Sequence, residues 1–235
     1  LARASKLLEA KKYDLSSSLY PYMMEPLESY IALLKNIPSG SKVLEIGGGM
    51  GENTEILLKL DHYVTSSDIS SKSVEVMKNK FVKYKTFKAE IADIESLPYK
   101  NNSFDVVCNA GSLSYGDNLK VMNEIHRVLV NGGCFIAMDS LNNNPIYKLN
   151  RFMHYLKGNR SKSTLSRIPN LKLIKNYKKK FGLIEVNYFG SLTWLFPILK
   201  IFMSSNNLKL FSRKVDSIFN IKRSGFKFTM KAKKL

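Results

Sequence analysis

The sequence has 235 residues, enough for one well-cored domain with elaborations, and its hydrophobic fraction of 44% is ordinary for a globular protein. Its two cysteines and three scattered histidines have no spacing typical of a metal site, so no metal is expected. The net charge of +18 lies in the second part of the chain. Residues 1–140 carry 16 Lys and Arg against 17 Asp and Glu, whereas residues 141–235 carry 21 against 2.

This basic second part predicts an anionic partner, namely a phosphorylated substrate, an acidic membrane surface or nucleic acid. The alternative is a Lys- and Asn-rich composition of the kind an AT-rich genome produces, which explains Lys over Arg but not the scarcity of acids. Cys108 and Cys134 both lie in apolar strand runs, which indicates buried free thiols in a reducing compartment. The first residues contain no apolar signal region. We therefore expect a cytoplasmic protein, with peripheral contact at the inner membrane face as a further option.

Residues 1–36 have an amphipathic helical pattern of Leu, Ile and Tyr, with interruptions at Pro21 and Pro26. We expect this segment to form a helical cap over the ligand pocket of the region that follows.

The run from Val43 to Thr54 predicts a strand that turns tightly into a helix around a ligand. Glu45 lies in the strand, and three glycines follow at alternate positions: Gly47, Gly49 and Gly51. Glycine lacks a Cβ, so the backbone can adopt positive φ and a ligand can approach the turn closely. A dinucleotide-binding turn has its third glycine three places after the second, where this sequence has Glu52. NAD is therefore disfavoured.

Apolar strand runs alternate with helical runs up to residue 140. The strand runs lie near residues 43–47, 63–68, 84–87, 104–109 and 134–139. Such alternation is typical of βαβ units, with a parallel sheet and helices on both of its faces. Ligands of such sheets bind beyond the carboxyl ends of the strands, where the glycine turn, Asp68, Asp93 and Asn109 all fall. The motifs converge on one crevice.

The glycine turn and four downstream elements resemble the motifs of class I S-adenosylmethionine (SAM) methyltransferases, including the ubiquinone and menaquinone methyltransferases. The turn has the form E/D-x-G-x-G-x-G, and Asp68 follows 17 residues after Gly51. Further along lie, in the family's order, Ala92-Asp93 with Leu97-Pro98-Tyr99, Phe104 to Asn109, and Glu124 to Gly133. Val130-Asn131 replaces the family's usual Lys-Pro, a departure that affects only turn chemistry.

This resemblance implies SAM as cofactor, S-adenosyl-L-homocysteine as product, and no metal. It implies that Glu45 holds the methionine portion, Asp68 the ribose hydroxyls and Asp93 the adenine amino group. The implied cofactor-binding residues are Glu45, Gly47, Gly49, Gly51, Asp68, Ile69, Asp93, Ile94 and Asn109. Three alternatives stay open: Glu45 as a cap of the turn, Asp68 as the N-cap of a helix starting near Ser70, and Asp93 as a solvated loop residue.

Two more strand runs, 183–191 and 225–234, complete the family's sheet. We therefore expect an α/β, Rossmann-like, doubly wound sheet of seven strands, mostly parallel with an antiparallel last strand. Within this single methyltransferase domain, we expect four segments: a cap at 1–36, a SAM-binding core at 37–140, a basic acceptor-side insertion at 141–182, and the last strands at 183–235 with a helical insertion at 193–224.

Residues 140–167 are polar, basic and aromatic, and we interpret them as short helices beside the sheet. The candidate acceptor-binding residues are Ser112, Tyr115, Arg151, Arg160 and Arg167. Their arginines are able to grip a phosphate through forked contacts, and a solvated basic loop is the alternative. If the acceptor is a hydroxyl, a general base is needed. His154 is the first candidate and Asp139 the second, because His62 lies at the wrong end of the sheet and His126 in a helix with a structural role.

The expected reaction is O-methylation of an anionic small molecule or glycan, such as a sugar, a nucleotide sugar or a lipid-linked saccharide. The glycan option rests on a looser resemblance to methyltransferases of polysaccharide biosynthesis. Alternatives are a quinone or other lipid precursor, RNA, or a non-enzymatic SAM-binding regulator. The stretch Asn109-Ala110-Gly111-Ser112 lacks the Asn/Asp-Pro-Pro-aromatic motif of base amino methylation, which makes nucleic acid the weaker option.

The apolar run Trp194 to Met203 is far shorter than the ~20 residues needed to span a bilayer. With its neighbouring lysines it fits a membrane interface, or equally a helix that covers the core or a dimer contact. The oligomeric state stays open.

Overall fold

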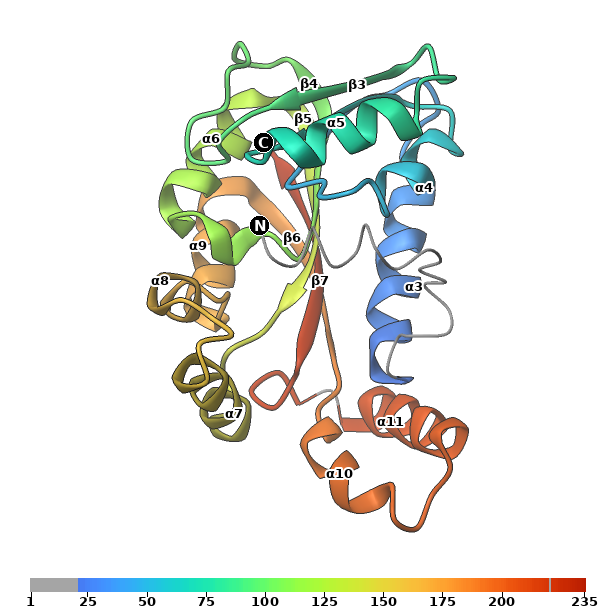
Figure 1. Ribbon diagram of the computed structural model, residues 1–235, viewed down its shortest axis with the longest axis vertical. Coiled ribbons are helices and arrows are strands. Elements are labelled where there is room, and N and C mark those ends of the chain that lie inside the picture. The colour runs from blue at the N-terminus through green and yellow to red at the C-terminus, as the bar shows by residue number, and fades with distance from the viewer. Residues whose placement is uncertain (1–20, 220) are drawn as a thin grey trace.

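A computed structural model describes residues 21–219 and 221–235 (Figure 1). The elements in chain order are α3 (Pro21–Lys35), β1 (Lys42–Ile46), α4 (Thr54–Leu58), β2 (Tyr63–Asp68), α5 (Ser71–Lys80), β3 (Phe87–Ile91), β4 (Phe104–Ala110), η1 (Leu113–Tyr115), α6 (Asn118–Val128), β5 (Leu129–Ser140), α7 (Pro145–Leu156), α8 (Lys162–Ser166), α9 (Leu171–Phe181), β6 (Gly182–Phe189), η2 (Thr193–Leu195), α10 (Phe196–Leu199), α11 (Ser205–Phe219) and β7 (Lys227–Lys234).

The strands form one seven-stranded sheet in the order β3-β2-β1-β4-β5-β7-β6. Neighbours from β3 to β5 pair in parallel, whereas β7 runs antiparallel to both β5 and β6. The expected Rossmann-like sheet with an antiparallel last strand is confirmed. Strands β2 and β3 are added on one side of β1, and the chain then crosses to the other side of β1 to form β4. The strand order therefore reverses its direction between β1 and β4. In sheets of this kind, ligands bind at the point where the strand order reverses, which here lies beyond the carboxyl ends of β1 and β4.

Two apolar cores cover the two faces of the sheet. Successive strand residues point to opposite faces, so Val43 belongs to one core and Leu44 to the other. Helices α3, α4 and α5 cover the first face with Tyr30, Leu34, Leu57 and Met77. Helices α6 and α9 cover the second face with Ile125, Leu173, Tyr177 and Phe181. Each such buried side chain contributes about 1.5–3 kcal/mol relative to exposure, so both faces of the sheet are needed for stability.

Three local expectations are wrong. The helical pattern is not interrupted at Pro26, because α3 continues through that residue and packs Tyr30 and Leu34 into the first core. The third strand lies at Phe87–Ile91 and not at 84–87, because Tyr84 and Phe87 form a turn after α5. Cys108 is buried, but Cys134 is partly exposed, and both are free thiols.

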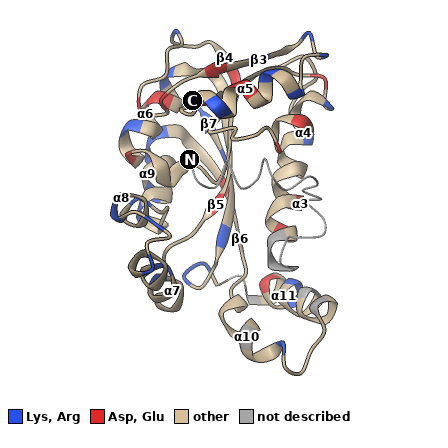
Figure 2. Ribbon diagram, in the orientation of Figure 1, with Lys and Arg blue, Asp and Glu red and all other residues tan. Residues whose placement is uncertain are grey.

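Helices are found in both regions for which insertions are expected. Helices α7 to α9 follow β5, and η2, α10 and α11 follow β6. Residues 1–20, which make up most of the expected cap, lie outside the described residues. Figure 2 shows Lys and Arg but neither Asp nor Glu on α7 and α8, which agrees with the separation of charge along the sequence.

Candidate functional site

The glycine turn after β1 has a backbone that only glycine adopts easily. Gly47, Gly49 and Gly51 have φ of +66°, +58° and +81°. A Cβ at Gly47 would collide with the side chain of Ser112, and one at Gly51 with the ring of Phe81. A Cβ at Gly49 would meet nothing closer than 3.7 Å. Gly49 is therefore at the open edge of the turn, whereas the other two glycines are held against their neighbours.

The carboxyl group of Glu45 lies beneath this turn and not on its open side. Glu45 is 2% exposed, and its Oε2 accepts hydrogen bonds from Thr54 Oγ1 and, at 2.7 Å, from Ser66 Oγ. These hydroxyls come from the start of α4 and from β2. Burial raises the pKa of Glu45 to about 7, against the effect of the two hydroxyls. These two hydrogen bonds make Glu45 a positioning residue of the turn, and its contact with the methionine portion stays a prediction.

Asp68 ends β2 and joins the glycine turn to α5. Its Oδ2 accepts a hydrogen bond from Gly49 N at 3.0 Å, and its Oδ1 accepts one from Ser70 N at 2.9 Å. The N-cap of α5 is Ser70, whose side chain accepts from Ser73 N. The alternative in which Asp68 caps that helix is therefore wrong, and its partly exposed carboxylate lies beside Gly49 at the carboxyl end of the strand.

Asn109 and Ser112 connect the ends of β1 and β4. Asn109 Nδ2 donates to Ile46 O at 3.3 Å and to Ser112 Oγ, and Ser112 Oγ donates to Ile46 O at 3.1 Å. Asn109 is fully buried, and its Oδ1 has no hydrogen-bond partner among the described residues. A buried acceptor without a partner is costly, so its position beside the glycine turn suits a donor supplied by a ligand.

The other predicted cofactor residues lie in two loops beyond the sheet. Ile69 is exposed, directly after Asp68. Asp93 is also exposed, and its Oδ1 accepts a hydrogen bond from Glu95 N at 2.8 Å. Ile94 is buried in the second core, where it packs near Gly116, so its side chain is part of the protein interior. Contacts of these three residues with a cofactor stay predictions.

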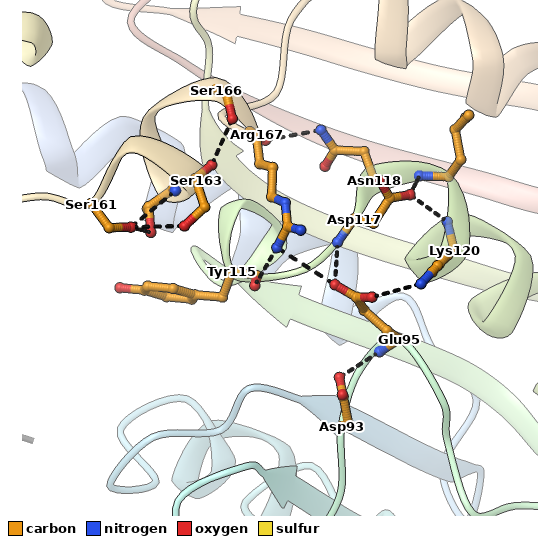
Figure 3. Close-up of polar contacts among 12 residues, drawn as sticks. Asp93, Glu95, Tyr115, Asp117, Asn118, Lys120, Ser161, Ser163, Ser166 and Arg167 are labelled. Carbon is orange, nitrogen blue, oxygen red and sulfur yellow. Dashed lines mark hydrogen bonds and ion pairs between the residues drawn. The ribbon is translucent and has the colours of Figure 1, made fainter.

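On the acceptor side, Arg167 connects the basic insertion to the loop after β4 (Figure 3). Its Nη1 lies 3.3 Å from Tyr115 O and 3.5 Å from Glu95 Oε1. Glu95 also accepts a hydrogen bond from Asp117 N at 2.7 Å. The predicted residues Tyr115 and Arg167 are thus brought together. Arg167 reaches a carboxylate two residues from Asp93, and the exposed Tyr115 ring points away from the contact.

A cluster of buried charges lies where β5 ends. Asp139 Oδ2 accepts from Leu113 N at 3.0 Å, and its Oδ1 accepts from Ser140 N at 2.6 Å. Arg151 Nη1 donates to Leu141 O at 2.8 Å and to Asn142 Oδ1 at 2.9 Å. Arg151 Nη2 is buried and has no hydrogen-bond partner among the described residues.

The titration of this cluster is set mainly by burial. Burial raises the pKa of Asp139, against the attraction of Lys227 and the backbone N–H groups. Burial lowers the pKa of Lys227, and Asp139 opposes this. Burial, followed by the nearby Arg160 guanidinium, lowers the pKa of Arg151 to about 10. Two cations, Lys227 and Arg151, therefore interact with the Asp139 carboxylate, and Arg160 adds positive charge beside Arg151, which leaves an excess of positive charge beside β5.

The three histidines differ in burial and in their place in the fold. His154 is exposed in the last turn of α7. The ring of His126 packs edge-on against Phe181 at 5.1 Å between centroids, which is a structural contact. His62 is buried at the start of β2, at the amino end of the sheet. Among the described residues, no group of three or more His, Cys, Asp or Glu side chains is arranged to hold a metal.

The family model described as "Methyltransferase domain" matches residues 44–137, which run from β1 to β5 and include the glycine turn, Asp68, Asp93 and Asn109. This segment is a class I methyltransferase domain. Phosphoethanolamine N-methyltransferase 2 from Haemonchus contortus, solved with phosphomonomethylethanolamine and S-adenosylhomocysteine, has the same fold. The TM-score is 0.61 at 19% identity, over 88% of this chain and 53% of that one.

Curated relatives match the methyltransferase domain at low identity. Sarcosine/dimethylglycine N-methyltransferase from Aphanothece halophytica is 30% identical over 46% of this chain and 41% of its own length. Demethylmenaquinone methyltransferase from Staphylococcus epidermidis is 27% identical over 56% of each chain. Ribosomal RNA small subunit methyltransferase A from Borreliella burgdorferi is 26% identical over 97% of this chain and 75% of its own length. The chain spans about half the length of the first two relatives.

Sequence reasoning missed several residues of the site. Ser66 and Thr54 hold Glu45, and Glu95 holds Arg167. Lys227 lies on β7, 88 residues after Asp139, and no local pattern connects them. The strand itself contains three further lysines, so nothing in its sequence distinguishes Lys227 from them.

Proposed function

We propose that this protein transfers a methyl group from SAM to an anionic acceptor. The binding of SAM is supported by three groups at the carboxyl ends of β1, β2 and β4. They are the open Gly49, the Asp68 carboxylate, and Asn109 Oδ1, which accepts no hydrogen bond from the described part of the chain. When bound, SAM supplies an electrophilic methyl carbon on a sulfonium cation.

The chain's own groups fit such a cofactor. Asp68 is a partly exposed carboxylate able to accept hydrogen bonds from ribose hydroxyls, and Asn109 Oδ1 is a buried acceptor for an ammonium or hydroxyl donor. Glu45 holds the turn from beneath, because its two hydroxyl partners fix the start of α4 against β2. The work of these groups is to align the acceptor with the methyl carbon, which is the main requirement of an in-line displacement.

The charge cluster beside β5 supports an anionic acceptor. Within residues 21–219 and 221–235, Arg151 Nη2 is a charged donor with no hydrogen-bond partner, and Lys227 and Arg160 add positive charge that Asp139 alone does not balance. A carboxylate or phosphate would satisfy this donor through a charge-assisted hydrogen bond. Asp139 holds Leu113, and with it η1, against β5, which makes it a positioning residue in this proposal. The expectation of a glycan acceptor receives no support from the relatives, whose names refer to an amino acid derivative, a quinone precursor and RNA.

The direct test is an assay of SAM consumption with pairs of acceptors that differ in one anionic group, such as sugar phosphates and free sugars. We expect turnover with the anionic member only. Arg151→Lys and Lys227→Met should each raise the KM of that acceptor about tenfold while the Kd for SAM stays unchanged, since each removes roughly one charge-assisted hydrogen bond. Lys233→Met, an exposed lysine on the same strand, is the matched control. Equal turnover of neutral and anionic acceptors would refute the anionic preference.

Ribosomal RNA is the second candidate acceptor, because the match to the rRNA methyltransferase covers 97% of this chain. The same assay with rRNA separates the candidates. Methylation of rRNA that falls steeply with salt, together with no turnover of small anions, would favour RNA.

If the acceptor is a hydroxyl, the reaction also needs a general base that takes its proton. His154→Ala should lower turnover and leave SAM affinity unchanged if the exposed imidazole takes the proton. Unchanged turnover in that variant moves the assignment to Asp139, which is tested by the pH profile of Asp139→Asn.

A further inference from the structure

Helix α7 exposes a continuous apolar stripe to solvent. At about 100° per residue, its exposed large apolar side chains fall on one side of the helix. They are Ile146, Leu149, Phe152, Met153 and Leu156, of which Leu149 and Leu156 expose 62% and 61%. The opposite side holds the buried Tyr147 and Arg151. A helix already packed on one side has no structural need for five apolar residues on the other.

Lysines border this stripe on both sides. Lys148 and Lys157 are exposed and fall at its two edges by the same helical geometry. This order of Lys, apolar stripe and Lys is typical of helices that lie in the surface of a membrane, because the lysine stems extend along the apolar region while the ammonium groups stay at the lipid headgroups.

A second apolar area lies around α10 and α11. Ile201 and Phe202, in the turns after α10, expose 75% and 79% of their surface. On α11, Leu210, Lys214 and Ile218 follow one another at intervals of one helical turn, and all three are exposed. This area repeats the combination of large apolar side chains with lysine.

Hydrogen bonds connect α7 to the chain segments before and after the second area. Tyr147 Oη, on the buried side of α7, donates to Gly190 O at 3.0 Å. Asn144 Nδ2, the N-cap of α7, donates to Ser224 Oγ at 3.0 Å. Figure 1 shows α7, α10 and α11 together at the lower end of the long axis. We call the exposed apolar residues of these elements, with Lys148, Lys157 and Lys214, the α7/α11 surface.

Few acidic side chains lie in the part of the sequence that forms the α7/α11 surface, so little negative charge there would repel an anionic partner. Residues 141–235 contain only two acids, Glu185 and Asp216. Asp216 is held inward, where its carboxylate accepts hydrogen bonds from Gly190 N at 2.6 Å and Ser191 N at 3.0 Å. On the neighbouring α3, Glu25 and Glu28 pair with Arg213 of α11 at 2.8 Å and 2.5 Å. Among the described residues, the α7/α11 surface therefore combines apolar side chains and positive charge with neighbouring carboxylates that already have partners. RNA would match the charge but not the exposed Leu and Ile, whereas an anionic lipid bilayer matches both.

We propose that the α7/α11 surface binds the face of an anionic lipid bilayer, with the apolar side chains inserted among the headgroups. No helix among residues 21–219 and 221–235 has the length and hydropathy to cross a membrane, so the contact is peripheral. The proposal does not depend on methyl transfer, because it concerns a surface formed by other residues than those of the crevice.

The test is co-sedimentation of the whole chain with vesicles of phosphatidylcholine alone or mixed with phosphatidylserine. We expect binding only to the mixed vesicles, weakened by salt. Leu149→Glu with Leu156→Glu should reduce binding about tenfold or more, and Lys148→Gln and Lys157→Gln about fivefold for each lysine. Val82→Glu replaces an equally exposed apolar residue elsewhere and should leave vesicle binding unchanged.

Circular dichroism checks that the variants are folded. SAM binding is measured in a separate titration, so a chain that does not bind SAM can still be tested for vesicle binding. The membrane proposal is overturned by equal binding to neutral vesicles, by unchanged binding of the Leu149 and Leu156 variant, or by binding of RNA in place of vesicles. It is also overturned if sedimentation velocity shows a dimer that the same leucine substitutions dissociate, since the surface would then be a contact between two copies.

Discussion

Replacing Glu45 by Gln should change how the stability of the protein depends on pH. The carboxyl group is fully buried and its pKa is raised from 4.5 to about 7, mainly by desolvation. Glutamine has the same shape and keeps an acceptor for the hydroxyls of Thr54 and Ser66, but it never becomes charged. The substitution therefore isolates the cost of a buried charge.

The sign follows from the protons bound in each state. Below pH ~4.5 the folded and unfolded chains both hold the proton, so the group has no effect. Between pH ~4.5 and ~7 the unfolded chain ionises first, and the free energy of unfolding falls as pH rises. Above pH ~7 the loss is complete, and at about 1.4 kcal/mol per pKa unit it amounts to about 3 kcal/mol. At pH 8, Glu45→Gln should thus be about 3 kcal/mol more stable than the natural chain, or roughly 6–12 °C higher in Tm for a protein of this size.

Thermal unfolding followed by circular dichroism at pH 5 and pH 8 measures this difference. At pH 5 the two proteins should differ by less than about 1 kcal/mol. Other titrating groups, including Asp139, are present in both proteins and cancel in the comparison. Glu75→Gln, at an exposed position of α5, is the control and should show no difference at either pH. If the Glu45→Gln protein has the same advantage at both pH values, the carboxyl group does not titrate as we describe.

Three further predictions concern the site. Gly49→Ala and Gly158→Ala both place a Cβ at positive φ in open surroundings, so each should cost about 1–2 kcal/mol of stability. Only Gly49→Ala should weaken SAM binding, as measured by calorimetry. Similar SAM affinity in both would show that Gly49 is only a turn residue. Asp68→Ala should weaken SAM binding roughly 10- to 100-fold. Asp105→Ala should leave SAM binding unchanged, because the Asp105 carboxylate accepts a hydrogen bond from Lys42 N at the amino end of the sheet. A larger effect of Asp105→Ala than of Asp68→Ala would contradict the role given to Asp68. Arg167→Met should raise the KM of the acceptor several-fold and leave the Kd for SAM unchanged, because it releases α8 from Glu95 and η1; a parallel rise in both constants would contradict this.

The parallel part of the sheet was predictable because β1 and β4 contain short apolar runs that face both cores, Val43-Leu44 and Val106-Val107-Cys108. β2 has a more polar sequence and ends at Asp68. Site residues lie at the ends of all three strands, since Gly47 directly follows β1 and Asn109 is the last residue but one of β4. β3 was misplaced by about four residues, because it is an edge strand with only Ala89 buried. Its mixed sequence, Phe87 to Ile91, resembles a solvated loop.

The direction of individual side chains was much harder to predict. The spacing of the glycines identified the turn, but it did not show that Ser66 and Thr54 donate hydrogen bonds to the Glu45 carboxylate beneath it. Arg151 was expected to grip a phosphate, with a solvated basic loop as the alternative, and its burial against the end of β5 contradicts the solvated loop for this residue. Both outcomes depend on partners from other elements, which local patterns do not contain.

The position of β7 between β5 and the edge strand β6 has a consequence for synthesis on the ribosome. β6 pairs only with β7, and β7 separates it from β5, so residues 182–189 have no strand partner until residues 227–234 have been made. The last lysine of β7 then joins the far end of β5, where Lys234 Nζ donates to Leu129 O at 2.7 Å. The nascent chain must therefore carry β6 with two open edges for some 40 residues of translation. Protection of that segment during synthesis is a requirement of this strand order.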